Sequence, residues 1–292
     1  MPAETRIAQL TDPHLPFGLP RGIERLGKRG LSWISWMLRR RRLHQADVAE
    51  ALLDDLLSDP HDLVAMTGDL INFGLPREFE ASRAWLESLG PPEQVLAIPG
   101  NHEALAGDWE GEMHRHWEGY AGQGRILVHG GVALIGVSSA CTTLPFFASG
   151  EVARAELDAL SRDLDAARDA GLIPVVAIHH PPTDLTVRRK ALRNLPETVE
   201  VIAKGGAALV LHGHTHRREL SWIDAPHGRI PVLGAASLSM TPGHPSAPGA
   251  WRSFRIWREG DEAQIEMRER TIAPDLRIHS GTPVRLRIPV LA

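Results

Sequence analysis

Five short apolar runs, each followed closely by acidic, amide or imidazole side chains, constrain the fold of this chain more than any other feature. Each run is four to six residues long, the length of a buried strand. The polar residues therefore follow the carboxyl ends of strands, where α/β proteins place their ligands. The pattern predicts an α/β fold with one shared site. The runs cover residues 6–10, 63–66, 95–98, 173–178 and 207–211.

The polar side chains after these runs offer oxygen and imidazole-nitrogen atoms. This donor set suits borderline divalent ions such as manganese, iron, zinc or cobalt. A carboxylate flanked by imidazoles on both sides is what a two-metal hydrolytic site requires. In chain order, the motifs are Thr11-Asp12-Pro13-His14, Thr67-Gly68-Asp69, Pro99-Gly100-Asn101-His102-Glu103, Ile178-His179-His180-Pro181-Pro182 and His212-Gly213-His214-Thr215-His216.

Most of these motifs, taken singly, have an ordinary structural interpretation. Asp12 before a proline is typical of a turn. His179 and His180 could be two ordinary histidines before a proline pair, where a strand can end. His214 and His216 are harder to explain by packing, because alternate residues of an extended segment point the same way. The occurrence of such motifs at five strand ends favours one metal site over independent turns.

The ordered series Asp-x-His, Gly-Asp, Gly-Asn-His-Glu, His and Gly-His-x-His resembles the signature of calcineurin-like metallophosphoesterases, over about residues 5 to 258. The resemblance implies the metallo-dependent phosphatase-like fold, a four-layer α-β-β-α sandwich of two mixed β-sheets with flanking helices. One residue departs from the family pattern: Glu103 stands where most members carry Asp. That carboxylate acts mainly behind the metal ligands in the family, so the change casts little doubt on metal binding.

The resemblance also implies which residues bind metal. Two divalent ions, of manganese, iron, zinc or cobalt, are expected. His179 is preferred over His180 because the family ligand lies two residues before the first proline, and His180 and His212 are expected to support the site or the fold. Asp12, His14 and His216 would hold the first ion, Asn101, His179 and His214 the second, and Asp69 would bridge them.

His102 follows a proposed ligand, so we expect it to face the substrate. In the family this histidine stabilises the phosphoryl oxygens or protonates the leaving group, and such general-acid help contributes roughly 10²–10⁴-fold. The alternative is a neutral structural histidine.

The resemblance implies a hydrolase of phosphoester bonds, either a phosphodiesterase or a phosphomonoesterase, acting by in-line attack of a metal-bridging hydroxide. One alternative is a membrane-associated hydrolase of a lipid-linked phosphodiester or pyrophosphate. Another is a non-catalytic metal-binding scaffold, which the complete set of seven ligands and His102 disfavours.

We expect one calcineurin-like domain over residues 1–274 and a tail, 275–292, with no assigned role, in which the alternation at 284–288 suggests an added strand. The net charge of −4 gives no nucleic-acid signature, and a single cysteine excludes an intrachain disulfide. The first five residues lack a secretory signal, and no run of 18 apolar residues occurs. These features predict a cytoplasmic enzyme.

An insertion of about thirty residues, 16–45, follows His14 and is far longer than a common strand-to-helix loop. Its pattern predicts a basic amphipathic helix whose apolar side covers either the domain or an anionic membrane surface. We therefore expect a lid or a docking arm. Ile23, Leu26, Leu31, Ile34, Met37 and Leu38 form the apolar side, Arg25, Lys28, Arg29 and Arg39 lie opposite, and Trp33 and Trp36 border them.

Overall fold

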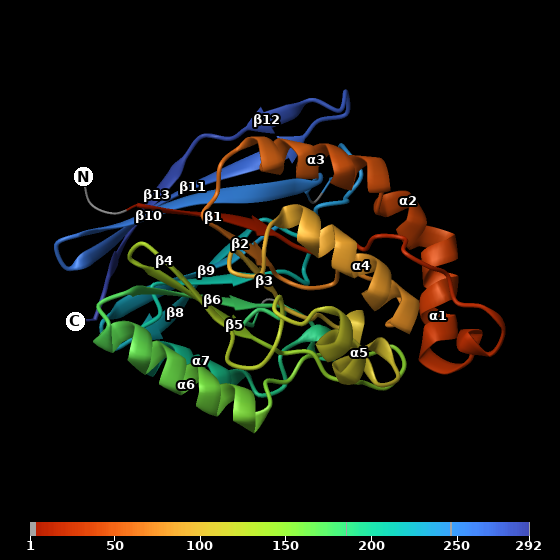
Figure 1. Cartoon of the computed structure of the whole chain (residues 1–292), viewed down its shortest axis with the longest axis horizontal. Coiled ribbons are helices and arrows are strands. Elements are labelled where there is room, and N and C mark those ends of the chain that lie inside the picture. Colours follow the sequence, from red (N-terminus) through yellow and green to blue (C-terminus); the bar gives the residue numbers. More distant parts are fainter. Residues whose placement is uncertain (1–3, 185, 246, 292) are drawn as a thin grey trace.

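The computed structural model describes residues 4–184, 186–245 and 247–291, and forms a four-layer sandwich (Figure 1). Two β-sheets stack face to face. Helices α3 (Ala46–Ser58) and α4 (Pro76–Leu89) cover one outer face, and α6 (Arg154–Asp169) and α7 (Leu195–Gly205) cover the other. The predicted α-β-β-α fold is confirmed. Residues 1–3, on which the absence of a secretory signal partly rested, and residue 292 of the tail lie outside the described residues.

The first sheet has the strand order β12-β11-β10-β1-β2-β3, and β13 also pairs with β11. The pairs β1–β2 and β2–β3 are parallel, whereas β10 runs antiparallel to β1. The expected strand of the tail therefore exists and extends this mixed sheet. The strands are β1 (Thr5–Leu10), β2 (Leu63–Met66), β3 (Val95–Ala97), β10 (Ala250–Glu259), β11 (Glu262–Ile272), β12 (Ile278–Ser280) and β13 (Val284–Pro289).

The second sheet has the order β4-β5-β6-β7-β9-β8. Its four inner strands are parallel, and β4 and β8 are antiparallel strands at the two edges. The turn residues His129-Gly130-Gly131 between two apolar runs predict a hairpin, and β4 and β5 form it. The strands are β4 (Ile126–His129), β5 (Val132–Val137), β6 (Ile173–Ile178), β7 (Leu209–His212), β8 (Glu219–Ala225) and β9 (Gly228–Gly234).

Three apolar layers hold the four structural layers together. The middle layer, between the sheets, contains Ile7, Leu96, Val175, Leu211 and Phe254, all fully buried. The outer layers pack α3 and α4 on the first sheet and α6 and α7 on the second, through such residues as Leu52, Phe79, Trp251, Leu164 and Ile202. Both faces of the central strands are covered, which explains why they are continuous apolar runs.

The sequence pattern predicts a helix over residues 149–170, but α6 begins only at Arg154, five residues later. The backbone amides of Gly150, Glu151 and Val152 donate instead to Ala191 O, Ser139 O and Asn194 Oδ1. These contacts to neighbouring loops hold the segment in a non-helical form, and tertiary bonds override local propensity there.

The insertion is helical, as expected, and lies at one end of the sandwich (Figure 1). It comprises a 3-10 turn (Gly22–Arg25), α1 (Gly27–Ser35), a π-helical turn (Trp36–Arg40) and α2 (Arg41–Leu43). The remaining helices are α5 (Trp109–His116) and the 3-10 turns Glu103–Leu105 and Arg188–Lys190. Within the described part of the chain, no helix is long and apolar enough to cross a membrane.

The expectation that the whole apolar side packs on the domain is wrong, because Ile23, Leu26 and Leu38 are 72–83% exposed. Trp33 and Trp36 make the contact instead, against Phe73 and its neighbours. Arg29 also faces the domain and donates to the carbonyl oxygens of Phe73, Gly74 and Ala106 at 2.7–3.0 Å. The physical reason is that these loop carbonyls require donors, which a guanidinium supplies and an aliphatic side chain does not.

Candidate metal centre

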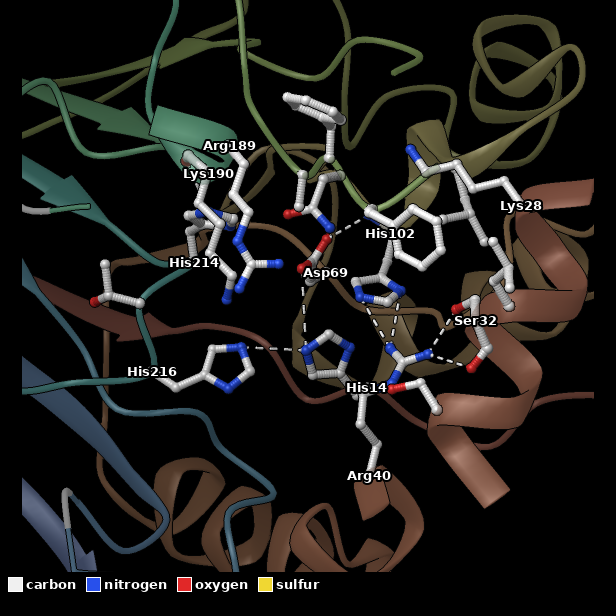
Figure 2. Close-up of a pocket in the computed structure, with 18 of the residues that line it drawn as sticks. His14, Lys28, Ser32, Arg40, Asp69, His102, Arg189, Lys190, His214 and His216 are labelled. Atoms are coloured by element: carbon white, nitrogen blue, oxygen red, sulfur yellow. Dashed lines mark hydrogen bonds and ion pairs between the residues drawn. The ribbon is translucent and has the colours of Figure 1, made fainter. Parts of the chain in front are cut away.

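Loops from both sheets bring the predicted ligands to one place. Asp12 and His14 follow β1, Asp69 follows β2, and Asn101 follows β3, three parallel neighbours that end at the same edge. The loops after β6 and β7 carry His179, His214 and His216 and approach from the second sheet. Figure 2 shows His14, Asp69, His214 and His216 around one cavity.

Five of the seven proposed ligands adopt the left-handed backbone conformation, with φ of 46–66°. Such a conformation costs of order 1–3 kcal/mol for a residue that is not glycine, and it clusters at functional sites. These residues sit in sharp turns that follow the strands. The backbone is thus strained where the proposed ligands lie, at Asp12, His14, Asp69, His214 and His216.

Acceptor atoms crowd the half of the site next to β1. His216 Nε2 lies 3.0 Å from Asp12 Oδ1 and 3.3 Å from His14 Nε2. The other oxygen of Asp12 is occupied, because it accepts bonds from the Thr11 hydroxyl and the His214 amide. One carboxylate oxygen and two imidazole nitrogens therefore converge, an arrangement that suits a divalent cation.

The second half of the site, formed by the loops after β3, β6 and β7, also brings acceptor atoms close together. His179 Nε2 lies 3.4 Å from Asn101 Oδ1, while its Nδ1 lies 2.8 Å from Thr67 O. A carbonyl bonded to one ring nitrogen fixes the tautomer and leaves the other nitrogen available to an ion. His214 is held likewise, with Nε2 3.0 Å from Lys190 O.

Asp69 connects the two halves. Its Oδ2 lies 3.4 Å from His179 Nε2 and 3.9 Å from His14 Nε2, and its Oδ1 accepts the His102 amide at 2.7 Å. Burial by itself would raise the pKa of Asp69, but His179, His102 and His14 hold it well below its ordinary value. This position between the two halves is compatible with the predicted bridging role of Asp69.

The electrostatic field around Asp69 also favours bound cations. Burial lowers the pKa of His179, yet the Asp69 carboxylate outweighs it and raises that pKa to about 9. In the field of the protein alone, a proton thus compensates the charge of Asp69. Metal ligation would replace that proton, because imidazole binds metals in its neutral form.

Two glycines permit the His179 and Asp69 side chains to lie close to the neighbouring backbone. A Cβ on Gly68, whose φ is +99°, would lie 2.3 Å from His179 Nδ1, and one on Gly100 would lie 2.3 Å from Asp69 Oδ1. Side chains at these positions would displace the ligands themselves. The glycines of the Gly-Asp and Gly-Asn-His motifs therefore have a steric cause.

His180 and His212 have other contacts. His180 Nδ1 lies 2.8 Å from Ser139 Oγ and its Nε2 lies 3.2 Å from Ala148 O, so both nitrogens face the protein. The His212 ring packs against Gly234 of β9. These contacts favour supporting roles for both residues and leave His179 free for an ion.

Glu103 lies directly behind the proposed ligands. Its fully buried carboxylate accepts the backbone amides of Asp69, Ile71 and Gly100 at 2.7–3.0 Å, which joins the loops after β2 and β3. Burial, assisted by Asp69, raises the pKa of Glu103 to about 8. The longer side chain that departs from the family pattern thus organises the site through its bonds to three backbone amides.

We expect Glu103→Ala to lower the free energy of unfolding by at least about 2 kcal/mol, because three buried amides lose their acceptor. Urea denaturation measures the change. Glu80→Ala, on the exposed side of α4, is the matched control and should change stability by less than about 0.5 kcal/mol. Equal effects of the two substitutions would contradict the role given to Glu103.

His102 contacts an arginine of the insertion. Its Nδ1 lies 2.7 Å from Asn72 O, which places the proton on Nδ1, and its Nε2 then accepts from Arg40 Nη1 at 2.9 Å. Arg40 also donates to the carbonyl and hydroxyl oxygens of Ser32. Burial lowers the pKa of Arg40 only to about 10, so the guanidinium is charged at neutral pH.

Sequence reasoning missed Arg40 and His44. Arg40 lies at the end of the π-helical turn, where a wheel drawn at α-helical spacing assigns wrong directions. His44 lies near the end of the insertion, with Nδ1 2.8 Å from Ser239 Oγ and its ring 4.4 Å from His14. Neither residue follows a strand, so the pattern that predicted the metal ligands gave no signal for them.

A cavity of about 520 Å³ opens onto the proposed metal ligands, and the insertion forms one of its walls (Figure 2). Arg189 and Lys190 line the opposite side. The cavity thus combines metal-binding acceptors, cations and apolar surface. Lys28, Leu31, Ser32, Ile34, Ser35 and Arg40 come from the insertion, and Phe146, Phe147 and Ala148 from the loop after β5.

Comparison with known proteins agrees with this geometry. The chain is 28% identical over 218 residues to a probable cyclic nucleotide phosphodiesterase of Synechococcus sp., covering 73% of this chain and 78% of that protein. It is 30% identical over 219 residues to a 3′,5′-cyclic-nucleotide phosphodiesterase of Nostoc sp., covering 72% and 71%. A dimetal phosphatase from Danio rerio shares the fold, with a TM-score of 0.61, 12% identity, and coverage of 99% of this chain and 100% of that one.

The family model for calcineurin-like phosphoesterases matches residues 5–218, which include all seven proposed ligands and His102. The acidic and imidazole clusters support binding of divalent metal ions. The chain therefore belongs to the calcineurin-like phosphoesterase family and is a metal-dependent phosphoesterase.

Proposed function

We propose that this enzyme hydrolyses phosphodiesters at two divalent ions, of manganese, iron, zinc or cobalt, bridged by Asp69. Asp12, His14 and His216 would hold one ion, and Asn101, His179 and His214 the other. The observation that carries the proposal is that one oxygen of Asp69 faces both His14 and His179. The donor set, of imidazole, carboxylate and amide groups, suits these metals.

When bound, such an ion pair supplies an activated water and neutralises charge on the phosphoryl oxygens. Side chains of the enzyme would bind and orient the phosphoryl group. Arg40 and His102 lie at the cavity wall beside Asp69, where a phosphoryl group would meet them. Arg40 supplies a fixed positive charge, and His102 positions its guanidinium and contacts the phosphoryl or leaving-group oxygen.

A diester is favoured over a monoester because the cavity has room and apolar surface for a second ester group. Leu31 and Ile34 lie on one wall, and Phe147 also lines the cavity. The cyanobacterial relatives are named for the hydrolysis of cyclic nucleotides, which are diesters. An aromatic or nucleoside group would contact these side chains while the phosphate lay on Arg40.

The test compares bis(p-nitrophenyl) phosphate, p-nitrophenyl phosphate and 3′,5′-cyclic AMP, each with manganese, iron, zinc or cobalt added to stripped enzyme. We expect kcat/KM for the diesters to exceed that for the monoester by at least about tenfold. Faster hydrolysis of the monoester under every metal condition would contradict the diester proposal.

Arg40 is expected to act on the transition state. Arg40→Ala should lower kcat by about 10²-fold with metal content unchanged, since loss of one preorganised donor to a developing negative charge costs about 10²–10³-fold. Arg39→Ala is the matched control, because that neighbour is exposed and does not line the cavity. The role of Arg40 is refuted if the two variants have equal kcat.

A further inference from the structure

Exposed apolar side chains occur on the two segments that flank the cavity, the insertion and the loop after β5. We call Ile23, Leu26, Leu38, Leu144 and Phe146 the apolar rim; each is 72–83% exposed. Single exposed apolar residues are ordinary, but a group beside one opening marks an interaction site. The rim is thus a candidate surface for a partner.

The two segments meet at the cavity. Leu31 and Ile34 of α1 line it together with Phe146 and Phe147 of the loop after β5. Lys28 Nζ also donates to Thr143 Oγ1 at 2.5 Å, which joins α1 to that loop. The rim therefore continues the apolar wall of the cavity outward onto the surface.

Basic residues accompany the rim. Residues 16–45 contain eight arginines and lysines and one glutamate, a net charge of +7, whereas the whole chain carries −4, which leaves −11 for the rest. Arg39, Arg41 and Arg42 are exposed at the end of the insertion. Across the cavity, the turn Arg188–Lys190 exposes three more cations. The charge of the chain is strongly asymmetric, with a large positive excess on the insertion that forms one wall of the cavity.

We propose that the apolar rim and these cations dock the enzyme on an anionic lipid surface. Interfacial helices combine an apolar side that enters the membrane boundary with basic residues that meet anionic headgroups. A second copy of this chain suits the surface poorly, because a two-fold contact would bring two insertions of +7 together.

Docking of this kind would turn the cavity toward the bilayer. A phosphodiester with a lipid tail could then enter with its phosphate at Arg40 and its tail along Leu31 and Ile34. This substrate class rests on the proposed function, whereas the docking surface does not.

The test is flotation of the full chain with phosphatidylcholine vesicles, with and without 30% phosphatidylglycerol. We expect binding only to the anionic vesicles. Arg39, Arg41 and Arg42, replaced together by serine, should weaken the partition coefficient by roughly 100-fold, since each charge near the surface contributes about 1 kcal/mol. Arg154, Arg162 and Arg287, exposed elsewhere, replaced together by serine are the matched control and should retain binding.

A second variant tests the apolar part. Ile23, Leu26, Leu38 and Leu144 replaced together by serine should lose vesicle binding, while the same change at Leu57, Val128, Leu220 and Leu276 should not. None of the four rim positions lines the cavity, so hydrolysis of bis(p-nitrophenyl) phosphate should be unchanged and shows that the variant is folded.

Absence of binding to anionic vesicles by the unaltered chain would overturn the docking proposal, as would equal loss in the rim and control variants. Light scattering without lipid must also show a monomer with and without the rim changes. Self-association that the rim variant abolishes would assign the surface to a second copy. Failure to hydrolyse the soluble diester would contradict the proposed function. The docking proposal would then still be tested by vesicle binding alone.

Discussion

Asp69→Asn is expected to weaken the binding of both metal ions and to reduce turnover by more than about 10³-fold. The carboxylate faces proposed ligands of both halves and would offset the repulsion between two cations. Asparagine keeps the size of the side chain and removes its charge, so the change tests the charge alone. Metal content by mass spectrometry and hydrolysis of bis(p-nitrophenyl) phosphate measure the two effects.

The control for this substitution is Asp54→Asn, at an exposed position of α3, which should keep full metal content and activity. An Asp69→Asn enzyme that held two ions per chain and turned over normally would remove Asp69 from the centre of the site. Loss of one ion only would mean that Asp69 binds metal in one half of the site and does not bridge the two ions.

His102→Ala is expected to keep its metals and lose about 10²-fold or more in kcat. The ring accepts from Arg40 and faces the cavity beside Asp69, and acid–base or positioning help of this kind contributes roughly 10²–10⁴-fold. If protonation of the leaving group is the main role, the loss should shrink for esters with good leaving groups, which a series of substituted phenyl diesters measures.

His129→Ala, at a half-exposed position of β4, is the control and should match the unaltered enzyme. Loss of metal from His102→Ala without a separate catalytic defect would make the residue structural or a ligand. An equal loss for all leaving groups would favour the positioning of Arg40 over proton transfer.

The strands and the seven proposed ligands could be predicted because both leave a local pattern in the sequence. A parallel strand covered on both faces appears in the sequence as a short apolar run. In α/β proteins the binding residues follow the carboxyl ends of such strands, so they can be found directly after each run. Asp12, Asp69 and His214 each follow such a run, which is why separate motifs could be assigned to one site before their distances were known.

The insertion could be predicted only in part, because its orientation depends on its partner. Arg29 is drawn inward by three carbonyl oxygens, and a π-helical turn rotates Arg40 toward His102. Neither effect has a signature within the insertion itself. His44 was missed for a similar reason, since its position beside His14 depends on a loop that contains Ser239.

Anomalous diffraction from crystals of the manganese-loaded enzyme tests the central claim most directly. We predict two peaks about 3.5–4 Å apart on either side of Asp69. One peak should lie beside Asp12, His14 and His216, and the other beside Asn101, His179 and His214. A single peak, or an ion without Asp69 among its ligands, would contradict the assignment of a two-metal centre bridged by this carboxylate.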